Sequence, residues 1–237
     1  WAGFDAAAAR VAAAVRAGRR GCVPFAFLAI SDSPADQLAC ARIYVADKCP
    51  PAAEQVWRGE RYDHARIRVA YLSADFYAHA TAYLMAGLFE RHDRARFETI
   101  GVSFGPDAKS ETRTRLMRAF DRFVDVRGQG DRDVARLLRD MEIDITIDLK
   151  GFTTDYRAEI LALRPAPVQV SYLGYPGTMG ADYIDYILAD RLVIPAAARP
   201  SYSERVVWLP DSFQVNDDAR RIAEGAPTRA DARLPES

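Results

Sequence analysis

Four side chains that are able to do acid–base or anion-binding chemistry fall within nine residues of one another: Ser73, Asp75, His79 and Thr81. An aspartate beside a reacting hydroxyl can accept its proton, or it can fix the tautomer of a neighbouring histidine. A histidine can act as a general base near neutral pH, or it can donate a hydrogen bond to a phosphate. The residues alone leave structural alternatives open: a loop-ordering Asx turn or cap for Asp75, and a surface position at a helix start for His79.

These side chains lie between a stretch that predicts a strand and one that predicts a helix. Arg66 to Ser73 contains the short apolar run of a strand that is buried on both faces of a sheet. From residue 82 onward apolar residues recur at helical spacing, so we expect a helix that begins at about Ala80. His79 would then lie at a helix N-terminus beyond the carboxyl end of a strand, where free N–H groups bind anions such as phosphate. Asp75 and His79 are both expected in a loop outside the core, so replacing either with alanine should leave the fold intact.

A second candidate stretch is the glycine-rich segment LGYPGTMG, which spans residues 173–180. Its three glycines and its proline permit unusual backbone angles and a close approach of a ligand to the main chain. The segment matches neither GxGxxG nor a Walker loop, so it indicates neither a dinucleotide nor an ATP phosphate site. From the residues alone, a plain tight loop stays the alternative.

Two separated motifs together carry a family resemblance. The run YLSADFYAHATAYLM and the run LALRPAPVQVSYLGYPGTMGADYIDYILAD at residues 161–190 resemble the bacterial relatives of protein O-linked N-acetylglucosamine transferase. Proteins of this family place tetratricopeptide repeats before a two-lobed glycosyltransferase domain of the GT-B architecture. The resemblance covers about residues 22–216 and implies that this chain corresponds to the N-terminal lobe alone.

The resemblance also implies roles for individual residues. It makes His79 and Asp75 the catalytic candidates. It adds a substrate-binding set, in which the leucine and the first glycine touch the donor sugar in relatives: Ala80, Thr81, Leu173, Gly174, Tyr175, Pro176 and Gly177. In relatives the first motif reads His-Pro-Thr, and here Ala80 replaces the proline. The eukaryotic enzymes carry another histidine near the segment that resembles residues 24–28, where this chain has Phe25 and Phe27.

The implied function is the transfer of N-acetylglucosamine from UDP-GlcNAc to serine or threonine hydroxyls of proteins. A relative that glucosylates asparagine and a non-catalytic protein-binding module are the alternatives. In this architecture the C-terminal lobe holds most of the nucleotide, so we expect residues 1–237 alone to be folded but inactive. No cofactor or metal is expected, because Asp144 and Asp148 share one face of a predicted strand but lack a further ligand.

The remaining sequence predicts an α/β fold with a largely parallel, doubly wound, Rossmann-like sheet. Beyond the opening unit, strands are expected at residues 97–104, 122–126, 143–149, 168–173, 183–188 and 205–209, and helices at 109–120, 131–141 and 156–163. Before it, helices are expected at 4–17 and 35–47. We therefore divide the chain into a helical segment at 1–62 that joins upstream repeats, a catalytic lobe at 63–215, and a linker at 216–237 towards a C-terminal lobe. The polar tail from residue 214 onward is expected to contribute no residues to a hydrophobic core.

The composition of the chain bounds its size and disfavours several other classes of protein. The chain has 237 residues, 49% of them hydrophobic, which suffices for one sizeable core. A net charge of −1 without a basic block disfavours nucleic-acid binding. Three cysteines without CxxC spacing argue against a disulfide framework and against a zinc site, and they fit a reducing cytoplasm. No apolar run reaches the roughly 18 residues that a membrane-spanning helix needs. Arginine greatly outnumbers lysine, which indicates a GC-rich, bacterial source. His64 and His92 lie among arginine and aspartate residues, so both are expected on a solvated surface.

Overall fold

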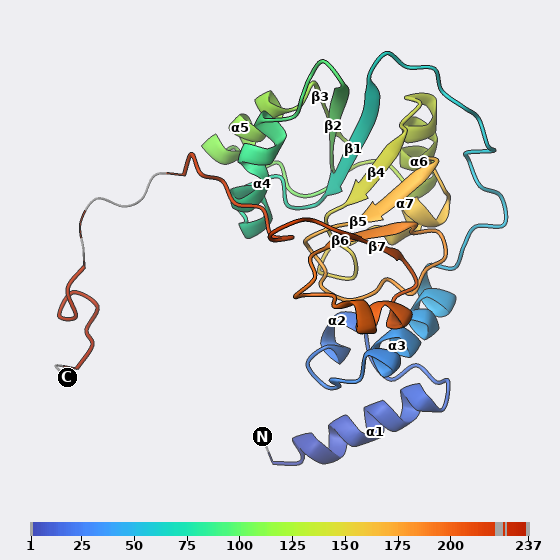
Figure 1. Ribbon diagram of the computed structural model, residues 1–237, viewed down its shortest axis with the longest axis vertical. Helices are drawn as coiled ribbons and strands as arrows, with labels where there is room; N and C mark the ends of the chain where they lie inside the picture. Colours follow the sequence, from blue (N-terminus) through green and yellow to red (C-terminus); the bar gives the residue numbers. More distant parts are fainter. Residues whose placement is uncertain (1, 221–224, 226, 236–237) are drawn as a thin grey trace.

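The computed structural model describes residues 2–220, 225 and 227–235. Within this part of the chain, parallel strands form one seven-stranded sheet in the order β3-β2-β1-β4-β5-β6-β7 (Figure 1). The strands are β1 (Ile67–Ser73), β2 (Phe97–Ser103), β3 (Arg122–Asp125), β4 (Ile145–Asp148), β5 (Val168–Ser171), β6 (Tyr186–Ala189) and β7 (Arg205–Trp208). The order reverses beside β1, so the carboxyl ends of β2, β1, β4 and β5 are neighbours at one edge.

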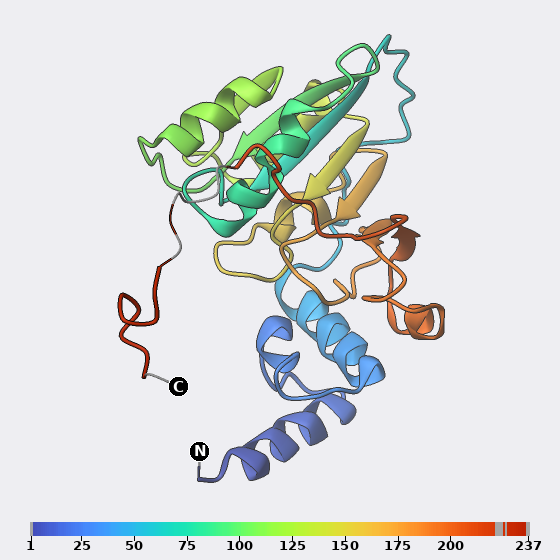
Figure 2. The ribbon, with the colours of Figure 1, turned by 60° about the vertical axis from the view of Figure 1, so that its left-hand side comes forward.

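Helices cover both faces of the sheet, which confirms the predicted doubly wound α/β class (Figures 1 and 2). They are α1 (Phe4–Arg16), α2 (Pro24–Phe27), α3 (Pro34–Lys48), α4 (Ala80–Glu90), α5 (Glu111–Ala119), α6 (Asp131–Asp140) and α7 (Ala158–Ala162), with a 3₁₀ helix η1 at Ala196–Ser201. Among the described helices, none combines the length and the apolar character needed to cross a membrane.

Each predicted strand is found, and the ends differ by at most three residues. The largest difference is at the strand predicted for residues 183–188, because Tyr183 and Ile184 belong to a turn in which the N–H of Ile184 donates to the carbonyl of Ala181. The strand starts only at Tyr186, after Asp185 has bonded to Gln169 of the neighbouring β5. The prediction located an apolar segment correctly but could not separate its turn from its strand.

The two faces of the sheet carry different hydrophobic clusters. On one face, α4 and α5 bury Met85, Phe89 and Leu116 against β1 and β4. On the other face, α6 and α7 bury Leu138 and Ile160 against β1 and β2. Strand β1 therefore packs on both sides, as its uninterrupted apolar run predicts.

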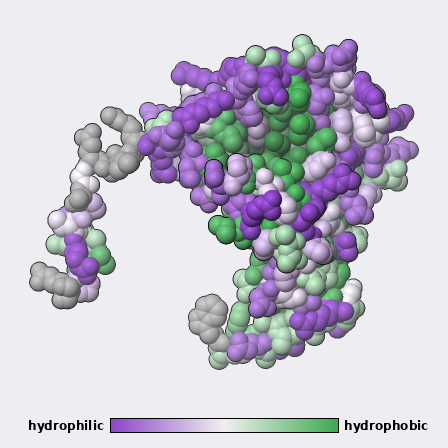
Figure 3. All heavy atoms as spheres, viewed as in Figure 1, coloured by the Kyte–Doolittle hydropathy of each residue, from purple (hydrophilic) through white to green (hydrophobic). Residues whose placement is uncertain are grey.

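The face that carries α4 is only partly covered by helices. Over β4 to β7 several apolar side chains on this face are only half-buried or are exposed, among them Ile145, Val168 and Val207. Figure 3 shows apolar surface gathered over the middle of the sheet and polar surface around it. In Figure 1 the C-terminal segment crosses this face towards α4.

This C-terminal segment corrects the prediction that the chain contributes nothing to the core from residue 214. Val215 packs against the cluster beneath α4, and Asp217 is a buried carboxylate that receives two hydrogen bonds from Arg115 of α5, at 2.6 and 3.2 Å. Gly87 of α4 leaves the room for it, because a Cβ there would lie 2.8 Å from an Asp217 oxygen. A polar run was therefore mistaken for a free linker, since its partners are more than a hundred residues distant in sequence.

The N-terminal helices form a small unit of their own and join the sheet through α3. Val15 of α1, Phe27 of α2 and Cys40 of α3 make a separate cluster. The other side of α3 packs on the α6–α7 layer through Tyr44 and Val45. The helices expected at 4–17 and 35–47 are confirmed, whereas the four-residue α2 was not expected. The division between residues 62 and 63 stays a prediction.

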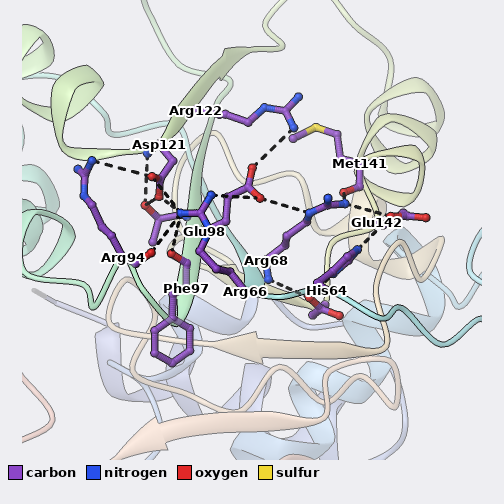
Figure 4. A network of polar contacts seen from close by, with 12 residues as sticks. His64, Arg66, Arg68, Arg94, Phe97, Glu98, Asp121, Arg122, Met141 and Glu142 are labelled. Carbon is purple, nitrogen blue, oxygen red and sulfur yellow. Dashed lines mark hydrogen bonds and ion pairs between the residues drawn. The ribbon is translucent and has the colours of Figure 1, made fainter.

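A network of ion pairs lies at the amino edge of the sheet and includes His64, which corrects the expectation of a solvated histidine (Figure 4). Its Nδ1 lies 3.0 Å from Asp144 and its Nε2 lies 3.0 Å from Glu142, with only 11% of its side chain exposed. Burial lowers the pKa of His64, but the two hydrogen bonds to carboxylates outweigh this effect and the net shift is upward. His92 was also mispredicted, because it is half-buried and bonds through Nε2 to the Tyr71 hydroxyl at 2.8 Å.

Candidate active site

The loop that follows β1 holds Asp75 at the carboxyl edge of the sheet. The backbone N–H of Asp75 donates to the Ser73 hydroxyl at 2.9 Å, which turns the chain sharply at the end of the strand. A close contact from the next loop fixes this turn, because a Cβ on Gly105 would lie 1.7 Å from the carbonyl oxygen of Ala74. Asp75 is consequently only 5% exposed, so it lies in the predicted loop but, contrary to expectation, it is buried.

His79 is the N-cap of α4, and the helix begins at Ala80 as predicted. The backbone N–H of Thr81 donates to its Nδ1 at 3.2 Å, and the backbone of His79 is extended, as is usual at this position. Its side chain is 39% exposed, while Ala80 is exposed and Thr81 is buried. In the neutral imidazole that makes this bond, Nδ1 carries the lone pair and Nε2 carries the proton.

The Asp75 carboxylate lies between a histidine and a lysine. Its Oδ2 is 3.6 Å from Nδ1 of His79 and accepts a hydrogen bond of 2.7 Å from Nζ of Lys150. The structure therefore brings together the two residues predicted to be catalytic. It also adds a third charged group that the sequence analysis did not select.

Lys150 belongs to the turn that follows β4, next to β1 in the sheet. It is one of only three lysines in the chain, and it comes directly after an apolar strand, which are two signals that would have singled it out. Only 4% of the residue is exposed. A buried ammonium group is costly unless it is paired, so its contact with Asp75 is a structural requirement of this site.

The side chain of Asp148, the last residue of β4, holds this turn in place through hydrogen bonds to its backbone. Its two carboxylate oxygens accept the backbone N–H groups of Lys150 and Gly151, at 2.9 and 3.0 Å. Burial raises the pKa of Asp148 to about 6, although both hydrogen bonds and the nearby Lys150 act in the opposite direction.

Asp144 lies at the other end of β4, where its carboxylate accepts the N–H of Arg68 and contacts His64. Four residues of strand separate the two aspartates by about 13 Å, so they cannot share a metal ion although they project from one face.

The glycine-rich loop after β5 packs tightly against the same turn. A Cβ on Gly174 would lie 1.9 Å from the carbonyl oxygen of Leu149 and 3.3 Å from Cα of Lys150. Leu173 has a left-handed backbone with φ of 65°, which for a leucine is rare and costs conformational energy. The predicted donor loop is therefore held against the turn that carries Lys150.

The other predicted residues of this loop differ in exposure. Tyr175 is buried and its ring packs edge-on against Phe152, while Pro176 is exposed. Gly177 lies against the Tyr175 ring, where a Cβ would be 2.5 Å from the hydroxyl oxygen. Phe25, from the segment where eukaryotic relatives carry a histidine, lies beside the same ring with centroids 6.3 Å apart.

The loop after Gly177 is anchored by a buried glutamate that the sequence analysis also missed. The hydroxyl of Thr178 and the backbone N–H of Met179 both donate to the Glu204 carboxylate, each at 2.6 Å. Glu204 comes directly before β7, so the last strand of the sheet holds the glycine-rich loop in place. Nothing in the local sequence around Glu204 indicates this contact, which spans 26 residues for Thr178.

The arrangement combines groups that suit a reaction of an anionic donor. A helix N-terminus stabilises negative charge, a half-exposed imidazole can hold or release a proton, and a glycine-rich loop lets a ligand approach the backbone. A surface hollow of about 730 Å³ lies elsewhere, along α5, and its described lining residues include none of the predicted site residues. The carboxyl edge of β1, β4 and β5 is therefore the candidate active site.

Comparison with known proteins agrees with the fold and the motifs. The chain is 37% identical over 176 residues to a probable UDP-N-acetylglucosamine-peptide N-acetylglucosaminyltransferase of Arabidopsis thaliana, covering 72% of this chain and 18% of that protein. It is 35% identical over 162 residues to the UDP-N-acetylglucosamine-peptide N-acetylglucosaminyltransferase of Caenorhabditis elegans, covering 66% and 14%. The chain thus spans less than a fifth of the length of these relatives.

A solved structure and a family match extend this result. A mutant of the O-GlcNAc transferase of Thermobaculum terrenum superposes with a TM-score of 0.71 at 27% identity, over 81% of this chain and 38% of that one. The shared part has the Rossmann-like architecture expected of a GT-B lobe. The family Glycosyl transferase family 41 matches residues 29–225, which is most of the chain. The chain belongs to glycosyl transferase family 41.

Proposed function

We propose that this chain is the N-terminal catalytic lobe of a protein O-GlcNAc transferase, which moves N-acetylglucosamine from UDP-GlcNAc to serine or threonine hydroxyls. The observation that carries the proposal is the group formed by Asp75 and His79 at the N-terminus of α4, beside the glycine-rich loop, in a chain of this family. The named relatives are transferases that use UDP-N-acetylglucosamine.

In the reaction, the acceptor hydroxyl oxygen forms a bond to the anomeric carbon while the bond from that carbon to the UDP oxygen breaks. The hydroxyl proton must go to a base, and the leaving diphosphate takes the electron pair. The N-terminus of α4 offers positive partial charge to that diphosphate. Ala80, Thr81 and the loop at residues 173–177 would line the donor, as in the family motif.

The tautomer of His79 decides which role its exposed nitrogen can play. With Nδ1 bonded to the N–H of Thr81, Nε2 carries a proton and can donate to a phosphate oxygen. If Nδ1 instead carries the proton and Asp75, whose Oδ2 lies 3.6 Å away, approaches to accept a hydrogen bond from it, Nε2 becomes free to accept the proton of the acceptor hydroxyl. Asp75 then acts by stabilising the second tautomer and the imidazolium.

The proposal includes no metal ion. Both carboxylates near the site are already engaged, Asp75 by Lys150 and Asp148 by two backbone N–H groups, and a helix N-terminus can take the place of a cation at the diphosphate. We expect turnover to persist in excess chelator. Loss of activity that a divalent ion restores would contradict this part of the proposal.

The wider assembly is also a proposal. A C-terminal lobe would hold most of the nucleotide, and upstream tetratricopeptide repeats would present acceptor proteins to the edge formed by α1 to α3. A bacterial cytoplasm is the proposed location, supported by the described cysteines, which are all free thiols. Burial raises the pKa of Cys40 to about 12 and that of Cys49 to about 11, so neither is an easily oxidised thiolate.

The experiment uses the complete reading frame, purified and incubated with acceptor peptides and either UDP-GlcNAc or UDP-glucose. Mass spectrometry locates the sugar. Addition of N-acetylglucosamine to serine or threonine supports the proposal, whereas glucose on asparagine would favour the N-glucosyltransferase alternative. Binding of peptide with no transfer from either donor would favour a non-catalytic module. Residues 1–237 alone, assayed in parallel, should be folded and inactive, and turnover by them would contradict the assignment of the nucleotide to another lobe.

A further inference from the structure

Two arginines near the end of the sheet share one tryptophan ring and have no acidic partner. The guanidinium carbon of Arg191 lies 4.3 Å from the centroid of the Trp208 ring, and that of Arg199 lies 5.2 Å from it. Both arginines are exposed. Among the residues that the structure describes, neither guanidinium group has a carboxylate within ion-pair distance or donates a hydrogen bond. Two unpaired guanidinium groups on one ring are suited to bind an anion such as a carboxylate.

The ring and the turn that carry this pair are fixed by hydrogen bonds. The indole N–H of Trp208 donates to the carbonyl of Ile194 at 2.8 Å. The Asp190 carboxylate accepts three backbone N–H groups, at 2.8 to 2.9 Å, two of them from the turn that contains Arg191. Asp190 is therefore engaged by the backbone and does not pair with the arginine that follows it. An anion would bind to a surface that needs little ordering of the main chain.

The strand register carries this pair to the same edge of the sheet as the candidate active site. Trp208, the last residue of β7, is paired with Ala189, the last residue of β6, and Arg191 lies two residues beyond β6. The strands are parallel, so the carboxyl ends of β6 and β7 continue the row formed by β1, β4 and β5. Neighbouring strands are about 4.8 Å apart, which places the pair roughly 14–19 Å from the loop that holds Asp75.

The donor and the acceptor would occupy different parts of this row. The diphosphate is proposed to lie at the N-terminus of α4, beside β1, and the sugar at the glycine-rich loop after β5. The part of the edge at β6 and β7 is therefore left for the acceptor. The helix η1, which carries Arg199, also packs against α3, in the helical segment to which acceptor proteins would be presented. Two positive groups in this place would select an acceptor with a negative side chain.

We propose that Arg191 and Arg199 form a subsite for an acidic side chain of the acceptor peptide. The proposal rests on the proposed function, because it assigns the acceptor side of that reaction. An extended peptide advances about 3.3 Å per residue, so an acidic residue about four to six positions from the acceptor serine or threonine would reach the subsite. The guanidinium groups would donate charge-assisted hydrogen bonds to its carboxylate while they remain in contact with the Trp208 ring.

The test uses the complete reading frame and serine peptides of otherwise uncharged sequence. One glutamate is moved along each side of the serine, and a matched peptide carries glutamine at the same position. We expect kcat/KM to be roughly 3–10-fold higher for glutamate than for glutamine at about four to six positions on one side of the serine, mainly through a lower peptide KM. The preference should weaken at high salt, because exposed charges are screened.

Variants of the two arginines show whether the preference comes from this subsite. Arg191→Gln combined with Arg199→Gln should remove it. Arg191→Glu combined with Arg199→Glu should reverse it, so that lysine is preferred at the same position, and a simple loss of structure could not produce this reversal. The matched control is Arg205→Gln, which removes an exposed arginine at the amino end of β7 and should keep the preference. If a double variant does not fold, each single glutamine variant should still weaken the preference.

Binding of labelled peptides, measured by fluorescence anisotropy without the donor, separates the subsite from the proposed function. Arginine-dependent binding of the glutamate peptide by a protein that transfers no sugar would overturn the proposed function and leave the subsite intact. Sugar transfer without a preference for glutamate, or with the same preference in the double glutamine variant, would overturn the subsite and leave the function intact. Arginine-dependent binding to phosphatidylserine vesicles without any glutamate preference would indicate a lipid site and would also overturn the proposal.

Discussion

The backbone N–H of Thr81 donates a hydrogen bond to Nδ1 of His79 at 3.2 Å, so a single imidazole both caps α4 and presents its other nitrogen at the candidate site. Capping and chemistry are therefore coupled at this residue. Any change in the protonation of Nδ1 breaks the cap and frees the Thr81 N–H, which lies at the positive end of the helix. The two roles can nevertheless be separated by substitution, since asparagine caps helices well but cannot act as a base near neutral pH.

Replacing His79 by asparagine should therefore preserve stability and abolish most activity. In the complete enzyme we expect kcat to fall by ~10²–10⁴-fold, the usual contribution of a positioned general base, and the donor KM to rise. His79→Ala should lose the same activity and in addition about 1 kcal/mol of stability, the cost of a missing cap. Steady-state kinetics and urea unfolding of both variants test this. Near wild-type kcat/KM in His79→Asn would make the histidine a structural cap only.

Asp75→Ala should lower kcat and, unlike the expectation from sequence, also destabilise the fold. It leaves the ammonium group of Lys150 buried without its partner, which typically costs about 3–5 kcal/mol. Asp75→Ala combined with Lys150→Met should recover part of this loss, because the unpaired charge is removed as well. Urea unfolding of the two single variants and the double variant measures the coupling. If the losses of unfolding free energy in the two single variants simply add up in the double variant, the two side chains do not interact in solution.

Asp148 should make stability depend on pH in the mildly acidic range. Its folded pKa is about 6, above the ordinary value of 3.8, so the native state binds more protons than the unfolded state between these values. Stability from this group is therefore fully present below about pH 4 and is lost as the pH rises to about 6, by at most about 3 kcal/mol. Asp148→Asn should remove that decline, whereas Asp140→Asn, an exposed aspartate on α6, should not. Unfolding free energies measured across this range would contradict the assignment if the two variants behaved alike.

Gly174→Ala should disrupt the contact between the two loops of the site. The added Cβ would meet the carbonyl oxygen of Leu149 at 1.9 Å, so one of the two backbones must move, at a cost of about 1–3 kcal/mol or more. Because that movement also displaces Lys150, kcat should fall together with stability. Gly128→Ala is the matched control, since a Cβ there meets nothing within 4 Å. Thermal unfolding and kinetics of both variants check the expectation, and an unchanged Gly174→Ala enzyme would contradict it.

The sequence by itself determined the elements and much of the candidate site. Its apolar runs located β1 and the other strands to within a few residues, and helical spacing placed the start of α4 at Ala80. Local polar residues after a strand indicated Asp75 and His79, and the structure places their side chains 3.6 Å apart. These features are readable because they depend on neighbours within one or two turns of the chain.

Only the tertiary structure decided which distant residues complete the site. Lys150 meets Asp75 across 75 positions of sequence because β4 lies beside β1 in the sheet, and strand order is not written in any local pattern. The same holds for His64 between Asp144 and Glu142, and for Asp217 against Arg115. From the sequence alone a charged residue is predicted to lie on the solvated surface, because the sequence does not identify the partner that would allow it to be buried. Burial and pairing of charges are properties of the assembled sheet, since the cost of burying a charge is offset only by a partner that folding brings to it.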